Sequence, residues 1–158
     1  MFRGIRRIKN EIGIEDCKEL LKTCKRAAFS VNGDDGYPYT IPINYYYSEE
    51  ENRIYFHSAK AGHKIDSIQK DNKVCFTVWG NEYKDEGDWA YRLSSCVVFG
   101  RASLITDPLL IEDKIRTFAL KYYPTVQEVD EEIARSLKNV QLVAIDIEHI
   151  AGKKVHEK

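Results

Sequence analysis

The sequence predicts a mainly β protein, a small antiparallel β-barrel decorated by α-helices, in a single domain that spans residues 1–158. About six segments have the composition and alternation of β-strands, and most are joined by turns too short for a parallel crossover. Segments with helical spacing of apolar residues lie at the front, middle and back of the chain. A length of 158 residues suits one domain.

The first half of the chain begins with a predicted helix and continues with strands. Ile14, Cys17, Leu21 and Cys24 recur at steps of three and four residues, as the apolar face of a helix does. The run at 32–36 is rich in Asn, Asp and Gly and predicts a turn. The helix and the three strands that follow it are predicted at residues 14–25, 27–31, 37–47 and 53–58.

The second half alternates helices with longer strands. Pro108 is well placed to open a helix, because the first helical turn does not need its missing N–H. Pro124 then ends that helix. The remaining predictions are a short helix at 62–70, strands at 73–80 and 91–106 around a polar loop at 81–88, a helix at 127–138 and a last strand marked by Val143, Ile145 and Ile147.

The charge balance and the hydropathy pattern exclude several classes of function. The 24 Lys and Arg residues are offset by 25 Asp and Glu residues, so the basic excess of a duplex-binding protein is absent and no nucleic-acid partner is expected. No run approaches 18 apolar residues, so we expect no membrane span and a cytoplasmic protein. The four cysteines form no CxxC pair, which favours reduced, partly buried thiols over a metal site.

A loop between a predicted strand and a predicted helix is the first candidate site. The strand ends at Ser58 and the helix begins near Gly62, and the start of a helix is a ready anion site. His63 and Lys64 fall in the first helical turn, where a cation opposes the helix dipole unless an anion is bound. The segment therefore predicts a phosphate site, with a solvated connection carrying two exposed cations as the alternative.

The predicted strand at 37–47 is the second candidate. Pro38 and Pro42 are four residues apart, so both remove a backbone donor on the same side of the strand. Asn44 offers a donor and an acceptor, which match the alternating edge of a flavin pyrimidine ring. The alternative is an ordinary edge strand that its prolines protect from aggregation.

Two further residue types are open to two interpretations each. His57 shares a strand face with Tyr55, so its imidazole could point at a ligand cavity and hold a proton, or could be a hydrogen-bonded barrel residue. Trp79 and Trp89 flank the polar loop and could cover a cofactor or pack in a subunit interface.

Four motifs in this order resemble the pyridoxamine 5′-phosphate oxidase-like flavoproteins, and within them the nitroimidazole-resistance (nitroimidazole reductase) group. The motifs are GYPYTIPINY at 36–45, IYFHSAKAGHKID at 54–66, NKVCF at 72–76 and SCVVFGRA at 95–102. The resemblance covers the chain from about Arg6 to Lys154. It implies a split β-barrel of the antiparallel six-stranded Greek-key type that binds FMN at the interface of a homodimer.

The resemblance also assigns roles to individual residues. It implies that the phosphate is held by Ser58, Ala59, His63 and Lys64. The isoalloxazine ring is expected to lie against Thr40, Ile41, Pro42, Ile43 and Asn44, with His57 close by as the one candidate catalytic side chain. Ser95 and Cys96 are expected to approach the cofactor from the partner subunit.

The implied activity is that of an FMN-dependent oxidoreductase of the nitroreductase kind. Electrons would pass from a reduced nicotinamide through FMN to a small planar acceptor, such as a nitro-aromatic or a quinone. The alternatives are a non-catalytic module of the same fold that binds flavin or haem, and a barrel that stacks single-stranded bases on its tyrosines. The vitamin-pathway oxidases of the resembled family carry a basic and aromatic C-terminal substrate segment, whereas this chain ends in IAGKKVHEK at 150–158, so oxidation of pyridoxamine phosphate is not expected. The cations of this tail are expected to be solvated.

Overall fold

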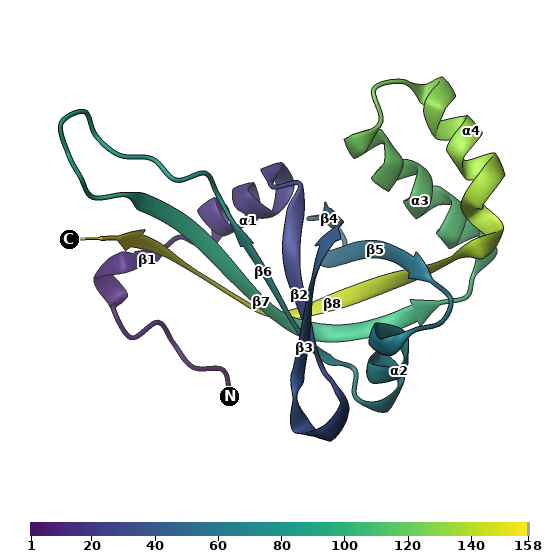
Figure 1. Cartoon of the computed structure of the whole chain (residues 1–158), viewed down its shortest axis with the longest axis horizontal. Coiled ribbons are helices and arrows are strands. Elements are labelled where there is room, and N and C mark those ends of the chain that lie inside the picture. The colour runs from purple at the N-terminus through teal and green to yellow at the C-terminus, as the bar shows by residue number, and fades with distance from the viewer. Residues whose placement is uncertain (158) are drawn as a thin grey trace.

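The computed structural model describes residues 1–157 and contains one antiparallel sheet with four α-helices (Figure 1). The strands are β1 (Glu11–Ile12), β2 (Arg26–Asn32), β3 (Pro38–Asn44), β4 (Tyr46–Ser48), β5 (Arg53–Ala59), β6 (Lys73–Trp79), β7 (Arg92–Ile105) and β8 (Val140–His156). The helices are α1 (Ile14–Thr23), α2 (His63–Lys70), α3 (Pro108–Tyr122) and α4 (Val126–Ser136), with short 3₁₀ turns at Ile8–Asn10, Asp34–Gly36 and Leu137–Asn139.

The strands form a half-barrel in the order β3-β2-β6-β7-β8-β5-β4, with β1 added to β8. Every pairing in this sheet is antiparallel, which confirms the predicted fold class. Within residues 1–157 the sheet has eight strands rather than six. The difference arises because the strand expected at 37–47 is broken at Tyr45 into β3 and β4, and because the short β1 was not predicted.

The hollow of the half-barrel holds the main hydrophobic core. On β2 the inward side chains are Ala27, Phe29 and Val31, which alternate with partly exposed neighbours. Phe29 packs on Phe56 of β5, with ring centroids 4.8 Å apart. The alternation that predicted these strands is therefore the alternation between the core and the outer face of the sheet.

The C-terminal residues form a strand, and Lys153 and Lys154 on it are exposed to solvent as expected. β8 extends to His156 and pairs with β7 over almost its whole length, including Ser95 with Lys153. Its outer residues are polar, so the sequence pattern that marked Val143, Ile145 and Ile147 stops before the strand does. Lys158 lies outside the described residues.

Helices α3 and α4 cover the other face of β5 (Figure 1). Tyr55 is fully buried there against Ile115 and Val129, which belong to a second, smaller core. Asp107 caps α3 by accepting from the N–H of Leu109, with Pro108 in the first turn as predicted. Within residues 1–157, no helix has both the length and the apolar character needed to cross a membrane, and the four cysteines are free thiols as expected.

Tyr45, between β3 and β4, is held by α3 instead of by a neighbouring strand. Its N–H donates to the hydroxyl of Tyr122 at 3.0 Å, and its carbonyl oxygen lies 2.8 Å from the same hydroxyl. The ammonium of Lys121 donates to the carbonyls of Tyr45 at 3.2 Å and of Cys24 at 2.8 Å. Because these side chains satisfy the backbone of a fully buried residue, the strand can break at this point without an orphaned polar group.

We expect Tyr122→Phe to destabilise the fold by about 1–3 kcal/mol, because the buried N–H and C=O of Tyr45 lose their shared partner. Chemical denaturation of the full-length protein measures the change. Tyr123→Phe is the matched control, since the Tyr123 side chain is 39% exposed and should lose almost nothing. Equal stability of the two variants would contradict the role assigned to Tyr122.

Burial lowers the pKa of Lys121 to about 8, whereas an unfolded lysine titrates near 10.4. Between these values the unfolded state binds more protons than the folded state, so the contribution of Lys121 to stability rises with pH. The unfolding free energy of the wild type minus that of Lys121→Met should therefore be larger at pH 9.5 than at pH 7.5. A difference that stays constant over this range would show that Lys121 titrates normally.

Candidate functional site

Two unpaired strand edges face one another where the sheet is split. Among residues 1–157, β3 is the last strand of the sheet and pairs only with β2. β5 pairs with β4 only over Arg53–Tyr55, so its end at 56–59 has a free edge opposite β8. The two strands diverge from the region of β4, and α2 begins beyond the end of β5 (Figure 1). Most of the residues predicted to bind a cofactor lie on these two edges or on α2.

The edge of β3 presents alternate residues to solvent. Thr40, Pro42 and Asn44 are exposed on the outer face, while the side chains of Ile41 and Ile43 turn toward the core. Only the backbone of the two isoleucines can therefore reach a ligand on the outer face. Proline is tolerated at strand positions whose amide faces away from the neighbouring strand. Thr40 and Asn44 alternate with Pro38 and Pro42 along β3, so their N–H groups also point away from β2, toward the free edge.

The start of α2 closes the wide end of the split. Gly62, with φ 130°, adopts a backbone conformation that a side chain would disfavour. Its carbonyl accepts from Ile65 and Asp66, and α2 has no side-chain cap, so the N–H groups of His63 and Lys64 have no acceptor within residues 1–157. Such free amides at a helix start favour an anion.

The two predicted phosphate cations have different surroundings. The ring of His63 stacks on Tyr39 at 4.2 Å, and its Nε2 lies 3.5 Å from the carboxylate of Asp34. Lys64 is partly buried and has no ion pair or hydrogen bond among the described residues. Burial lowers the pKa of its ammonium. Within residues 1–157 the ammonium of Lys64 thus has no anionic partner, whereas His63 already lies beside the carboxylate of Asp34.

His57 lies beside Lys64 and against α3. Its ring meets the ring of Phe118 edge-on at 4.9 Å. Burial lowers the pKa of His57, the positive charge of Lys64 lowers it further, and Glu132 opposes the effect. The imidazole is therefore neutral at pH 7, able to donate and accept one hydrogen bond each. Ser58, which follows it on β5, is largely buried, and Ala59 at the strand end is exposed.

Ser95 and Cys96 do not join the split within one chain. Ser95 lies opposite Trp79 on the outer face, three strand spacings from Asn44, which corresponds to roughly 14 Å. Cys96 points the other way and is fully buried in the core beside Cys17, and burial raises the pKa of its thiol. The side chain of Cys96 is a core group, so only its backbone could approach a cofactor on the outer face.

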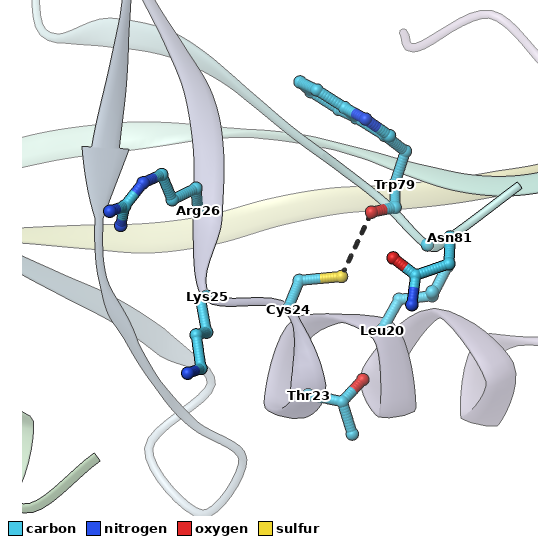
Figure 2. Close-up of a pocket in the computed structure, with 8 residues that line it drawn as sticks. Leu20, Thr23, Cys24, Lys25, Arg26, Trp79 and Asn81 are labelled. Atoms are coloured by element: carbon cyan, nitrogen blue, oxygen red, sulfur yellow. Dashed lines mark hydrogen bonds between the residues drawn. The ribbon is translucent and has the colours of Figure 1, made fainter. Parts of the chain in front are cut away.

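A cleft of about 520 Å³ lies at the junction of α1, β2 and β6, and the sequence did not predict it. Figure 2 shows the indole of Trp79 extending over the space between Cys24 and Arg26. The cleft is lined by Leu20, Thr23, Cys24, Lys25, Arg26, Trp79, Gly80 and Asn81. Its position is linked to the split, because the guanidinium of Arg26 donates to the side-chain oxygen of Asn44. The adjacent Lys25 and Arg26, and an exposed tryptophan at a strand end, were the available signals.

The half-barrel with two free strand edges defines a split β-barrel. The sequence profile of the family described as "Pyridoxamine 5′-phosphate oxidase" matches residues 14–154. The chain therefore belongs to the pyridoxamine 5′-phosphate oxidase family. No curated protein matches the chain.

Solved structures share this fold at low sequence identity. A candidate 5-nitroimidazole antibiotic resistance protein from Bacteroides thetaiotaomicron superposes with a TM-score of 0.78 at 19% identity, over 92% of this chain and 87% of that one. A FAD-binding protein from Mesorhizobium loti gives 0.64 at 18% identity, over 92% and 96%. The FAD-binding protein from Mycobacterium smegmatis gives 0.61 at 16% identity, over 93% and 98%. These likenesses establish the fold.

Proposed function

We propose that the protein is a flavin-dependent oxidoreductase that binds FMN in the split and works as a homodimer. In this proposal a reduced nicotinamide is the electron donor, and a small planar nitro-aromatic or quinone is the acceptor. The observation that carries it is the unpaired, partly buried Lys64 beside the free amides at the start of α2. Relatives named as FAD-binding proteins and as a candidate nitroimidazole resistance protein support a flavin and such an acceptor.

The residues at the wide end of the split fit a flavin phosphate. A phosphate monoester carries about two negative charges and accepts several hydrogen bonds. Lys64 would supply the countercharge, the free N–H groups of His63 and Lys64 would donate, and Ser58 adds a hydroxyl. FMN ends in such a monoester, whereas in FAD the same phosphate continues into a diphosphate, so a terminal site of this kind favours FMN.

The outer face beside β3 fits a planar ring. Next to Pro42 on the neighbouring strands lie the small side chains of Ala28 and Thr77, in the same cross-strand row. A ring can approach such a surface closely, and the outward N–H groups of Thr40 and Asn44 offer donors to its polar edge. The first residues of β3 contact α2, since Tyr39 stacks on His63 at 4.2 Å. A ring beside Pro42 would therefore be joined by the ribityl chain to a phosphate at the start of α2.

A second copy of the chain would complete this surface. Ser95 and Phe99 lie on this outer face, where Phe99 is 38% exposed. Ser95 is too far from Asn44 to meet the same ring within one chain. In the homodimer we propose, Ser95 of one subunit faces the flavin of the other.

When bound, the flavin supplies the hydride and electron-transfer chemistry. The role left to the chain is to bind the cofactor, orient it and exclude water. Neutral His57 can hold a proton at one ring nitrogen and accept one at the other, at the free edge of β5. A non-catalytic flavin- or haem-binding module is the second candidate, because no acid–base pair beyond His57 faces the split within residues 1–157.

We expect Lys64→Met to lower the flavin content of the purified protein at least tenfold, because the phosphate loses its countercharge in a partly buried site. The ratio of absorbance at 450 nm to that at 280 nm, together with the mass of the released cofactor, measures occupancy. Lys84→Met is the control, since Lys84 is exposed in the loop that follows β6, at the opposite end of that strand from α2. Equal flavin content in the two variants would remove the phosphate assignment.

We expect the purified protein to show a flavin spectrum that a reduced nicotinamide bleaches under anaerobic conditions, with recovery on addition of a nitro-aromatic. Stopped-flow absorbance at 450 nm follows both half-reactions. A bound flavin that neither NADH nor NADPH reduces would favour the binding module instead. A Soret band would identify haem as the ligand.

A further inference from the structure

Three backbone carbonyls at the cleft between α1, β2 and β6 already accept hydrogen bonds. The carbonyls of Cys24 and Lys25 accept from Lys121 and from the Tyr122 hydroxyl, at 2.8 and 2.7 Å. The carbonyl of Trp79 accepts from the thiol of Cys24 at 3.3 Å (Figure 2). A ligand that needed acceptors would therefore find few here.

The donors of the same cleft are free. The ammonium of Lys25, the indole N–H of Trp79 and the side-chain amide of Asn81 make no hydrogen bond with any described residue. The guanidinium of Arg26 uses one of its five N–H groups on Asn44. The cleft thus offers an excess of unused donors from four different side chains.

The charge and shape of the cleft favour a small anionic ligand with a flat ring. Lys25 and Arg26 have no ion-pair partner within residues 1–157, and no Asp or Glu lines the cleft. The indole of Trp79 offers a flat, half-exposed aromatic surface beside these two cations. A volume of about 520 Å³ is in the range of small-molecule sites.

We propose that this cleft binds a planar aromatic carboxylate, with its ring against Trp79 and its carboxylate on Lys25 and Arg26. The Arg26–Asn44 hydrogen bond places the cleft beside the edge of β3. The assignment of such a ligand as the second substrate rests on the proposed function, since it would then lie next to the flavin ring. Binding itself does not depend on that function.

The test uses 4-nitrobenzoate as the probe and the uncharged methyl 4-nitrobenzoate as its matched control. The chain has two tryptophans, so Trp89→Phe leaves Trp79 as the sole indole and Trp79→Phe leaves Trp89. In the full-length Trp89→Phe protein without reductant, we expect saturable quenching by the acid and at least tenfold weaker binding of the ester. Arg26→Gln and Lys25→Gln should each weaken the acid about tenfold, and Lys138→Gln should not.

Three results would overturn the proposal: equal binding of acid and ester, equal saturable quenching in the two tryptophan variants, or unchanged affinity in both cation variants. Displacement of the probe by added FMN would also overturn it, by assigning the cleft to the flavin. Flavin content is measured in the same preparations. Probe binding in a protein without flavin would refute the proposed function and support the carboxylate site in the cleft. Bound flavin without probe binding would support the proposed function and refute the carboxylate site.

Discussion

The geometry of this protein depends on how the backbone of Tyr45 is satisfied. A buried residue between two strands needs partners for its N–H and C=O, and a continued ladder with β5 would supply them. Here the hydroxyl of Tyr122 and the ammonium of Lys121 supply them instead. If the register of β4 and β5 continued, Asn44 would face His57 across a closed ladder. Because α3 takes those bonds, β3 leaves β5 and the barrel opens.

An opening between two strands carries a physical cost that a ligand can offset. The free edges of β3 and β5 expose backbone groups that can pair with another chain. Pro38 and Pro42 reduce that risk on β3 by removing donors, and α3 covers the end of β5 through Phe118. The uncapped start of α2 and the unpaired Lys64 remain, and both favour an anion over water or a second strand. The split is therefore an opening in the barrel whose surrounding groups favour the binding of an anion.

The sequence predicted what depends on local pattern. The alternation of Ala27, Phe29 and Val31 located β2, and Pro108 located the start of α3. The break at Tyr45 could not be predicted, because its cause is a side chain 77 residues away. The extension of β8 was missed for a related reason: the outer face of a half-barrel tolerates polar residues such as Lys153, so the apolar signal stops while the hydrogen bonds continue.

The same distinction applies to the candidate sites. The candidate phosphate segment is continuous in sequence, so its Ser, Gly and Lys could be singled out together, and their binding of a phosphate stays a prediction. The burial of the Cys96 side chain was not predicted, because a motif gives the order of residues but not which of two alternating faces each side chain takes. The cleft was missed because Lys25 and Trp79 come from segments more than 50 residues apart, which only the pairing of β2 with β6 brings together.

The split and the cleft are two consequences of one set of contacts. Lys121 bonds the carbonyls of Cys24 and Tyr45, so a single ammonium fixes both the wall of the cleft and the apex of the split. Tyr122 does the same for Lys25 and Tyr45. By occupying the acceptors of the junction, α3 leaves a surface of donors on its far side, and the bond from Arg26 to Asn44 joins that surface to the edge of β3. Helix α3, outside the barrel, thus contacts both the residue where the sheet opens and the wall of the neighbouring cleft, while the positive charge of that cleft belongs to Lys25 and Arg26.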